Sequence, residues 1–596
     1  MPTSAKELPP VARQIVVARV LRSTAVGYGL FFWSGWTALT TQVLWARALR
    51  AMLGGSHRSE ALVVGVFFAA IPIGAWWVAR WLRRSPSSRA LWRAYALTEL
   101  VSSLAIAMAV LLLGREQWQS ATLDYLLLAC LGIPGAALGA IWPLMVTLLG
   151  ARGAAVSKLY AVHTLGSALG ALGASLLMAE LLGTRRGLLL AAAVGVLLSC
   201  LGLLLSRRAT QQRSDAESHA PPAPQYAHGF QAPIALITTI GVASGFLTVA
   251  FEWLGTRLLA LRVTTTAYSL GLTLCVQLLG MAIGAQLASR FYSRGLPALR
   301  FALLAATLGV CWAPLLAGIR APLGGEHTFF DAARVATLEA ATLIGPGAIA
   351  LGALFPLCCS LLSERAASPG VALARLAALN GLAGLGGALV MSEILLPTFG
   401  LGYSLLSSAL LTLLPWLYLT FKTRGAGLEL AAVTPLLAAG FVQGANFRVT
   451  HVEAGEHIVA EVEGPAGVAA VIEGEGGLRR MLVNGRHTLG DNLSRTVARR
   501  FAQLPGLLAS DPKRMLLVGL GTGITRGAAE EVASANGASL DVAELMPEVA
   551  ALTRHFEPWQ ARFGKRSQLH VSDGRQVLRD SHEPFDLVIS ELTTDN

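Results

Sequence analysis

The hydrophobic pattern of the first 421 residues predicts a series of membrane-spanning helices. Twelve apolar stretches are long enough to cross about 30 Å of hydrocarbon at about 1.5 Å per residue. Their approximate cores are 24–46, 60–80, 94–114, 121–149, 159–183, 187–206, 232–256, 266–289, 301–319, 335–362, 376–396 and 401–421. Residues 1–23 are basic and lack a small-residue cleavage site, so we expect the first stretch to be a membrane helix rather than a removable signal.

The helical region contains an internal repeat. The segment SGWTALTTQVLWARAL, from Ser34, aligns without a gap with SGFLTVAFEWLGTRLL, from Ser244, at an offset of 210 residues. A second block pairs residues 138–143 (LGAIWP) with 351–356 (LGALFP). The pattern therefore predicts two six-helix repeats, 24–206 and 232–421, in the same orientation, as in major-facilitator-like transporters.

Basic residues in the connections predict how the helices are oriented. With the N-terminus inside, the inside connections carry 21 Lys and Arg residues and the outside connections carry 10. Because basic loops stay in the cytoplasm, we expect both ends of the twelve-helix unit, and the C-terminal region after it, to be cytoplasmic at a bacterial inner membrane. Residues 207–231, rich in Pro, Ser and Gln, are expected to form a cytoplasmic linker between the repeats.

Composition narrows the class of protein further. The 596 residues are 54% hydrophobic and 14% charged, with a mean hydropathy of +0.57, which excludes a single soluble globule, a disordered chain and a fibrous protein. Residues 1–427 carry 31 basic and 14 acidic side chains, against 16 and 21 in 428–596. The basic excess thus belongs to the part in the lipid bilayer and indicates no nucleic-acid partner. All six cysteines lie in apolar segments, so we expect no disulfide framework and no metal site.

Several charged residues lie inside or near the predicted spans: Arg47, Glu99, Glu180, Glu252, Arg257 and Glu393. Glu252 occupies the position of Gln42 in the first repeat. Charges within a membrane are costly and often functional. Two interpretations stay open: Glu252 pairs with Arg257 or Arg47 and locks the halves together, or it relays a proton or a substrate.

A short connector, 422–446, follows the last span. Its apolar stretch, Leu428–Val442, contains Pro435 and has about fifteen residues, which is short for a crossing. We expect an interfacial or re-entrant segment. A thirteenth crossing, the alternative, would place the C-terminal region outside.

Short β-branched runs then predict a small antiparallel β unit over 447–490. The runs are Arg448–Glu453, His457–Glu463, Val468–Glu473 and Leu478–Val483. Asn484-Gly485, directly after the last run, is typical of a type I′ hairpin turn. A helix is expected next, over Asn492–Leu504, before Pro505.

Residues 491–596 have the pattern of an α/β Rossmann-like domain. A strand over Lys513–Val518 is followed by the glycine turn Gly519–Gly523 and a helix over Ala528–Ser534. Further strands are expected at Ser539–Ala543, Gln568–Ser572 and Phe585–Ser590, followed by Glu544, Asp573-Gly574 and Glu591. In parallel sheets these acids would gather at the carboxyl ends of the strands, where ligands bind. Because glycines have no side chain, a nucleoside could approach the backbone N–H groups of this turn closely. The Glu544 carboxylate could accept hydrogen bonds from the ribose hydroxyls.

The tail, of the form LLVGLGTGIT…VAEL.PEV…SDGR…FDLVISE, resembles the spermidine synthase (polyamine aminopropyltransferase) family, a branch of the class I S-adenosylmethionine methyltransferase fold. The whole chain resembles bacterial proteins that fuse a major-facilitator-like region to such a domain. The resemblance implies that Gly519, Gly521 and Gly523 line S-adenosylmethionine or its decarboxylated form. It also implies that Glu544 holds the ribose and that Asp573, before Gly574, meets the adenine amine.

The tail departs from that family at three places. Thr522 stands where the family has an aspartate in the glycine turn, and residues 493–499 (LSRTVAR) replace an acidic amine-binding segment. Thr594 takes the place of the catalytic aspartate, and only a one-residue slip would supply Asp595. Roughly three more strands are expected after the fourth, so either the chain is part of a longer protein, which we expect, or the tail is a degenerate half-domain.

Three functions follow from these patterns. The main one is a membrane-embedded transferase that uses the sulfonium nucleoside for aminopropyl or methyl transfer to an acceptor. The alternatives are a transporter with a nucleoside-binding regulatory tail and a non-catalytic scaffold of a membrane complex with partner proteins. Because expected carboxylates are missing, we predict that residues 1–596 bind a nucleoside without transferring an aminopropyl group to putrescine.

Overall fold

The computed structural model describes residues 10–53, 57–113, 121–209, 233–262, 267–319, 329–422, 427–445, 449–450, 452–485, 487–559 and 567–591. Contacts divide the chain into two compact units. The helical unit is built from Met1–Arg47, Val63–Met391 and Gly402–Asn446, and the sheet unit from Ala48–Leu62, Ser392–Leu401 and Phe447–Asn596.

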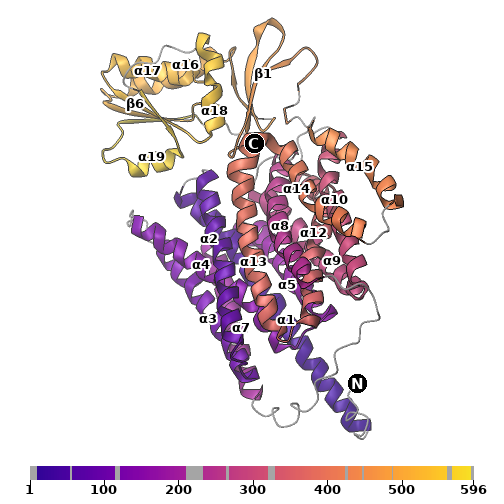
Figure 1. Cartoon of the computed structure of the whole chain (residues 1–596). Coiled ribbons are helices and arrows are strands. Elements are labelled where there is room, and N and C mark those ends of the chain that lie inside the picture. Colours follow the sequence, from indigo (N-terminus) through magenta and orange to yellow (C-terminus); the bar gives the residue numbers. More distant parts are fainter. Residues whose placement is uncertain are drawn as a thin grey trace. The chain divides into compact units, whose positions relative to one another are not determined.

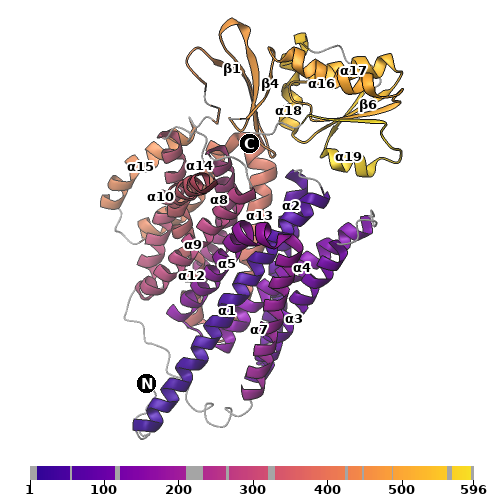
Figure 2. The same cartoon turned by 180° about the vertical axis from the view of Figure 1, so that it is seen from behind.

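Long apolar helices form the helical unit, except that the end of α1, the start of α2, most of η5 and the start of α14 belong to the sheet unit (Figures 1 and 2). Those before the linker are α1 (Pro10–Leu53), α2 (His57–Leu82), α3 (Ser88–Leu113), α4 (Ala121–Leu148), α5 (Ala154–Gly173), the π-helical turn η2 (Ala174–Met178), α6 (Ala179–Leu181) and α7 (Gly183–Arg208). Those after it are α8 (Ile234–Arg262), α9 (Ala267–Phe291), η4 (Tyr292–Arg294), α10 (Leu296–Ile319), α11 (Phe329–Leu343), α12 (Gly345–Arg365), α13 (Pro369–Val390), η5 (Met391–Leu395), α14 (Leu396–Lys422) and α15 (Gly427–Ala445).

The described residues contain 10 helical segments that are long and apolar enough to cross a membrane. Each of the predicted apolar cores falls on helix in the structure, so the prediction of a multi-pass helical membrane domain is confirmed at that level. The core predicted over 335–362 is wrong in one respect, because α11 ends at Leu343 and α12 begins at Gly345. Pro346 lies in the first turn of α12, where its missing N–H costs no helical hydrogen bond.

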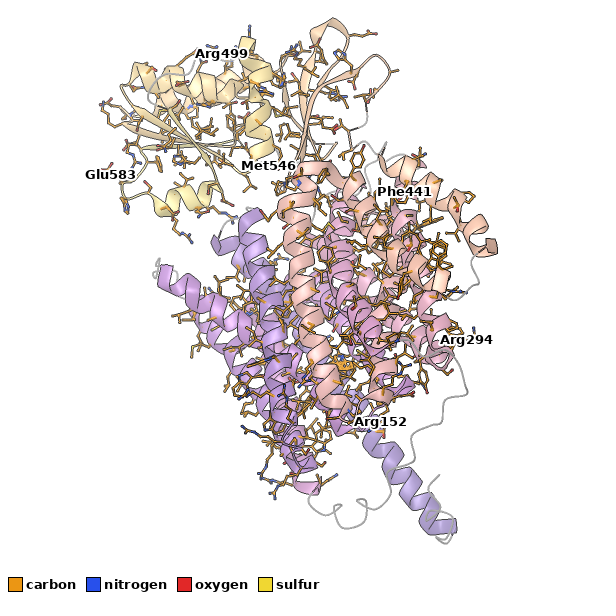
Figure 3. The ribbon with its side chains drawn as sticks, in the orientation of Figure 1. Arg152, Arg294, Phe441, Arg499, Met546 and Glu583 are labelled. Carbon is orange, nitrogen blue, oxygen red and sulfur yellow. The ribbon has the colours of Figure 1, made fainter. Side chains whose placement is uncertain are left out.

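The apolar connector is a single helix, α15, which carries Phe441 (Figure 3). Its 19 residues are within the usual range for a membrane span. It packs along α10, where a Cβ added to Gly440 would lie 2.9 Å from the Cβ of Cys311. Its apolar segment Val433–Gln443 falls among the shorter apolar helices and not among the candidate spans, so the choice between an interfacial segment and a thirteenth crossing stays a prediction.

The sequence repeat has a counterpart in helix packing. A Cβ added to Gly74 would lie 1.8 Å from the carbonyl oxygen of Ala136, where α2 crosses α4. A Cβ added to Gly284 would lie 2.1 Å from the carbonyl oxygen of Ile349, where α9 crosses α12. Gly74 and Gly284 are related by the offset of the first repeated block, and Ala136 and Ile349 by that of the second. The same close crossing is therefore built twice, by glycines that let the backbones approach.

In the sheet unit, an antiparallel sheet has the order β1-β2-β3-β4. Its strands are β1 (His457–Glu463), β2 (Val468–Glu473), β3 (Arg479–Val483) and β4 (His487–Asp491). Asn484 and Gly485 have φ values of 52° and 70°, which confirms the predicted hairpin turn. The strand expected over Arg448–Glu453 is wrong, because residues 449–450 and 452–453 lie in no strand, and β4 was not predicted.

The helix expected over Asn492–Leu504 is shifted, since α16 spans Arg495–Leu508 and contains Pro505. It starts late because the Asp491 carboxylate accepts the Ser494 N–H at 2.6 Å and holds a turn ahead of the helix. Proline is tolerated near the helix end because only one backbone donor is lost.

A second, all-parallel sheet has the order β7-β6-β5-β8. Its elements are β5 (Arg514–Val518), α17 (Ile524–Ala535), β6 (Ser539–Glu544), α18 (Pro547–Leu552), η7 (Thr553–Trp559), β7 (Ser567–Val571), α19 (Gly574–Asp580) and β8 (Leu587–Ser590). The fourth strand of this sheet along the chain, β8, pairs in parallel with the first, β5. Helices α16 and α17 lie on one face of the sheet and α19 on the other (Figures 1 and 2).

Candidate functional site

The helical unit encloses a cavity of about 220 Å³ between its two repeats. Helices α1, α2, α4 and α5 line it from the first repeat, and α8, α9, α12 and α13 from the second. Most of the lining is apolar. The polar lining side chains are Gln42, Tyr160, His163, Thr164, Ser167, Thr248, Glu252 and Asn380.

Glu252, on α8, faces this cavity. Arg47 instead pairs with Glu180, at 3.6 Å on a half-exposed surface. Within the described part of the chain, we find no hydrogen bond or ion pair to the Glu252 carboxylate, and hence no pair with Arg47 or Arg257. The interpretation of Glu252 as a lock between the halves is therefore not what the structure shows.

The repeated glycines position two further polar residues of the cavity. A Cβ on Gly35 would lie 2.3 Å from the carbonyl oxygen of His163, where α1 meets α5. A Cβ on Gly245 would lie 2.1 Å from the carbonyl oxygen of Asn380, where α8 meets α13. Equivalent helix crossings thus place His163 and Asn380 in one cavity, and the sequence alone had identified neither.

The Asn380 amide is held by hydrogen bonds, whereas the Nε2 atom of His163 is not. The Asn380 amide donates to the carbonyl oxygen of Gly241 at 2.8 Å and to the Ser244 hydroxyl at 3.2 Å. The buried Nε2 of His163 has no hydrogen-bond partner among the described residues. A polar atom of this kind beside a cavity is available to a ligand or to water.

Three aromatic rings form one wall of the cavity. The ring centroids of Trp142 and Tyr160 are 6.1 Å apart, those of Trp142 and Phe355 are 6.3 Å apart, and those of Tyr160 and Phe355 are 5.6 Å apart. Trp142 and Phe355 are equivalent residues of the second repeated block. The two repeats therefore meet through their own aromatic side chains.

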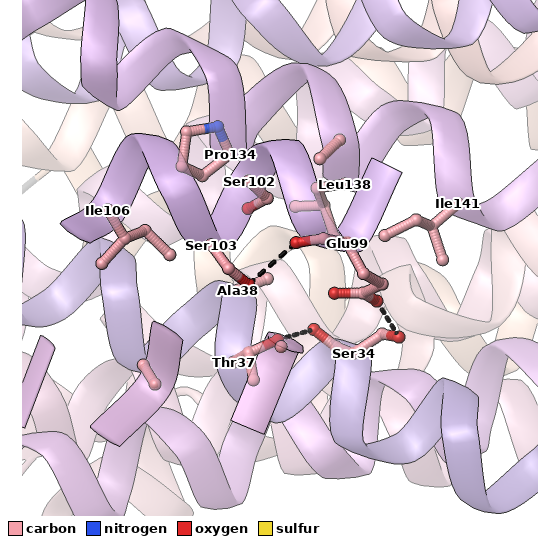
Figure 4. A pocket seen from close by; sticks show the side chains of 13 residues that line it. Ser34, Thr37, Ala38, Glu99, Ser102, Ser103, Ile106, Pro134, Leu138 and Ile141 are labelled. Carbon is pink, nitrogen blue, oxygen red and sulfur yellow. Dashed lines mark hydrogen bonds between the residues drawn. The ribbon is translucent and has the colours of Figure 1, made fainter. Parts of the chain in front are cut away.

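Glu99 lies apart from this cavity, beside a pocket of about 20 Å³ that is large enough for one water molecule (Figure 4). Its carboxyl group accepts a hydrogen bond from the Ser34 hydroxyl, which lies 3.0 Å from the Tyr95 hydroxyl. Only 3% of Glu99 is exposed. Glu393, in η5, lies 3.2 Å from the Ser392 hydroxyl. These two acids are structural neighbours of hydroxyl groups and do not line the central cavity.

In the sheet unit, the glycine turn lies at the carboxyl end of β5. Gly519, Gly521 and Gly523 have φ values of 98°, 50° and 77°, which side chains with a Cβ rarely adopt. A Cβ on Gly519 would also lie 2.4 Å from the carbonyl oxygen of Glu591. The turn therefore requires glycine both for its backbone conformation and for the close approach of the chain after β8.

Glu544 holds this turn in place. Its carboxylate accepts the Leu520 N–H at 3.0 Å and the Met546 N–H at 2.9 Å. The side chain is buried, at 8% exposure. Each oxygen retains a second lone pair, so the ribose role implied by the resemblance is compatible with this structural role.

The remaining predicted ligand residues lie around the same turn. Thr522 is buried, and a Cβ on Gly490 of β4 would lie 3.3 Å from its Cγ2 atom. Asp573 caps α19 by accepting the Arg575 N–H at 2.8 Å, and it pairs with the Arg575 guanidinium at 2.8 Å. The hydrogen bond between the two side chains raises the pKa of the Arg575 guanidinium. Gly574 lets α19 approach β5, because an added Cβ would lie 2.6 Å from Val518.

Glu591 is an acid of this site whose environment the sequence did not predict. Burial raises the pKa of its carboxyl group, against the effect of a hydrogen bond from the Thr525 side chain. Its N–H donates to the carbonyl oxygen of Val518 at 2.9 Å. Thr594 and Asp595, the two candidate catalytic positions, lie outside the described residues.

Comparison with known proteins gives only structural similarities. No protein-family model and no curated protein matches the chain. The human organic anion transporter MFSD10 (TETRAN) is similar with a TM-score of 0.43 and 17% identity, over 66% of this chain and 98% of that one. The major facilitator superfamily proton:xylose symporter XylE, bound to 6-bromo-6-deoxy-D-glucose, has a TM-score of 0.43 and 14% identity, over 68% and 96%. The apolar helices themselves show that this chain is a multi-pass helical membrane protein.

Proposed function

We propose that the helical unit is a small-molecule transporter whose substrate passes through the central cavity. The observation that carries this proposal is Glu252, whose carboxylate faces the cavity without a partner among the described residues. An unpaired carboxylate inside a membrane is costly, and it persists where it meets a ligand, a proton or water. The alternative function from the sequence, a transporter with a ligand-binding tail, is thus preferred to a membrane-anchored transferase.

The contacts between the two halves support alternating access. Ser157 on α5 lies 2.7 Å from Ser360 on α12, and the Gly153 N–H donates to Ser363 at 2.9 Å. A Cβ on Gly271 would lie 1.7 Å from the Ser175 hydroxyl, where α9 passes η2. Contacts between small residues and single hydrogen bonds can break and re-form as two parallel repeats rock about a central site.

Cavity access tests this proposal without a known substrate. In a chain freed of native cysteines, Thr248→Cys should react with a membrane-impermeant thiol reagent added to either side of a proteoliposome. The control is a chain that keeps Cys200 as its single cysteine. Cys200 lies on the exposed side of α7, outside the cavity, and should not be labelled from both sides. Labelling of Thr248→Cys from one side only, under every ion gradient tried, would contradict transport.

For the tail, we propose that the glycine turn binds the nucleoside of S-adenosylmethionine or its decarboxylated form. Three glycines with positive φ follow the carboxyl end of β5, and among the described residues no group accepts a hydrogen bond from the Gly521 N–H. The turn would hold the nucleoside, with Glu544 at the ribose and Asp573 near the adenine. When bound, such a cofactor would supply an activated alkyl group on sulfur.

Calorimetry on the full-length protein tests this second proposal. S-adenosylhomocysteine, a stable thioether, should bind to the wild type and lose affinity in Asp573→Ala. Glu531→Ala, in an exposed ion pair on α17, is the matched control and should bind normally. Equal heats for the wild type and Asp573→Ala would rule out the proposed site.

The side of the membrane that the tail faces follows from α15. We propose that α15 crosses the membrane, because it packs along α10, and that the sheet unit and the N-terminus therefore lie on opposite sides. In intact cells, exposed Arg83→Cys should be protected from an impermeant reagent, whereas Ser534→Cys, exposed on α17, should be labelled. Protection of both would restore the cytoplasmic tail that the sequence predicted. The result also decides which pool of nucleosides the tail meets.

A further inference from the structure

The charge of the central cavity determines the kind of solute it can hold. Among the 26 lining residues, all within the described chain, Glu252 is the single Asp, Glu, Lys or Arg. None of these described lining residues carries a guanidinium or ammonium group that could neutralise it. In a low-dielectric environment, one carboxylate without a counter-ion attracts a cation and repels an anion.

The cavity also has the aromatic surface that favours organic cations. Trp142, Tyr160 and Phe355 contribute adjacent rings from α4, α5 and α12. Phe67 and Phe68 add two more rings from α2. Aromatic faces attract desolvated ammonium groups and also cover the apolar body of a ligand.

The uncharged polar groups of the cavity accept hydrogen bonds. Gln42 stands at the position equivalent to Glu252, and the Asn380 amide nitrogen is already bonded to Gly241 and Ser244, which leaves its oxygen as an acceptor. The Nε2 of His163 has no partner among the described residues. These groups can accept an N–H from a substrate ammonium, but they supply no second full charge.

A single carboxylate selects for the number of charges as well as their sign. A polyamine carries several ammonium groups, and each would need a carboxylate or water in this cavity of about 220 Å³. A compact monocation needs only Glu252 and can bury the rest of its surface against the rings.

We propose that the central cavity binds an organic monocation with a compact aromatic or aliphatic body, and that Glu252 is its counter-ion. This inference rests on the proposed function only in treating the cavity as the substrate site. It names a substrate class different from the polyamine that the resemblance of the tail implies.

Equilibrium binding to the full-length protein in nanodiscs provides the test. The probe is labelled benzyltrimethylammonium, whose fixed charge does not depend on pH. Phenylacetate tests the opposite charge on a similar body, and spermidine tests multiple charges. We expect benzyltrimethylammonium to bind and to be displaced by neither of the other two at equal concentration.

Two variants with matched controls locate the site. Glu252→Gln should weaken binding of the probe roughly tenfold or more, whereas Glu180→Gln, on the surface, should not. Phe355→Leu should weaken it roughly threefold, whereas Phe301→Leu, on an exposed face of α10, should not. Monodisperse elution of each variant shows that it is folded.

The outcomes separate this inference from the transport proposal. Absence of probe binding, equal affinity in Glu252→Gln, or stronger binding of phenylacetate or spermidine would each overturn the monocation inference. Uptake of another solute class into proteoliposomes would then leave transport standing. Binding of the probe through Glu252 in a protein whose cavity opens to one side only would confirm the cation site and contradict transport.

Discussion

The two candidate sites use their carboxylates in opposite ways. Glu252 of the helical unit faces a cavity without a partner among the described residues, whereas Glu544 of the sheet unit accepts two backbone N–H groups. Asp573 is likewise occupied, because it caps α19 and pairs with Arg575. An acid that builds the fold has little freedom to change partners during function. The comparison teaches that a ligand in the cavity would meet an acid without a described partner, whereas a ligand at the turn would meet acids that the fold already uses.

The largest expected effect is that of Glu544→Ala on the sheet unit. Removal of the carboxylate leaves the Leu520 and Met546 N–H groups without their acceptor. At about 1–3 kcal/mol for each unsatisfied buried donor, we expect a loss of about 2–6 kcal/mol of local stability. Hydrogen exchange of the full-length protein should show faster exchange in β5 and the glycine turn.

Two controls sharpen this contrast. Glu531→Ala, on the exposed side of α17, should leave exchange in the turn unchanged. Glu252→Gln should leave the thermal stability of the helical unit unchanged or higher, because no described partner loses a bond. If Glu252→Gln destabilised the protein as much as Glu544→Ala, the distinction between a ligand-binding and a fold-building acid would fail.

A smaller effect is expected where the repeated helices cross. In Gly74→Ala the new methyl group would lie 1.8 Å from the Ala136 carbonyl oxygen, so α2 and α4 must separate, at about 1–3 kcal/mol. Gly65→Ala, on the same helix, is the matched control, since nothing lies within 4 Å of its added Cβ. Thermal unfolding in detergent measures both. Equal melting temperatures would show that the crossing is not tightly packed.

The extent to which sequence predicted the molecule differs between elements and sites. The helix cores and the four strands of the parallel sheet follow from local hydrophobic pattern, so both could be predicted. The break at Ile344 precedes Pro346 in the first turn of α12, and the late start of α16 depends on one hydrogen bond to Asp491; hydrophobic pattern reports neither. The three glycines of the turn were predictable because their positive φ values require glycine.

Tertiary contacts explain what the sequence could not provide. His163 and Asn380 are isolated polar residues in apolar helices, and only the crossing of α1 with α5 and of α8 with α13 brings them into one cavity. The equivalence of Gly35 and Gly245 was visible, but their packing partners follow different offsets in the chain. The two hydrogen bonds that the Glu544 carboxylate accepts from backbone were hidden for the same reason, because the one donated by the Leu520 N–H joins the ends of two strands.

Glu99 allows a test of a third kind of acid, one buried with a hydroxyl partner. Glu99→Leu leaves the Ser34 and Tyr95 hydroxyls without the carboxyl group and should cost about 1–2 kcal/mol, whereas Glu99→Gln keeps an acceptor and should cost less than about 1 kcal/mol. The melting temperature measures both variants. Binding of benzyltrimethylammonium should be unaffected, since Glu99 does not line the central cavity. Loss of that binding in Glu99→Gln would link the two acids.

The smallest effect is a pH dependence that distinguishes the two acids flanking β8. Burial raises the pKa of Glu591 in the folded state, so the folded protein holds that proton more tightly than the unfolded chain does. The stability from this group is present at low pH and is lost as the pH rises above the ordinary glutamate pKa and through the raised pKa.

Asp586 behaves oppositely, because backbone N–H groups of Arg514 and Lys513 lower its pKa. Its contribution is present above the ordinary aspartate value and is lost as pH falls through the lowered one. Hydrogen exchange measures this stability as the protection of the β5 amides. The fall in protection at high pH should disappear in Glu591→Gln, and the fall at low pH should disappear in Asp586→Asn. A Glu591→Gln protein with an unchanged high-pH decline would show that this carboxyl group is solvated beside the turn.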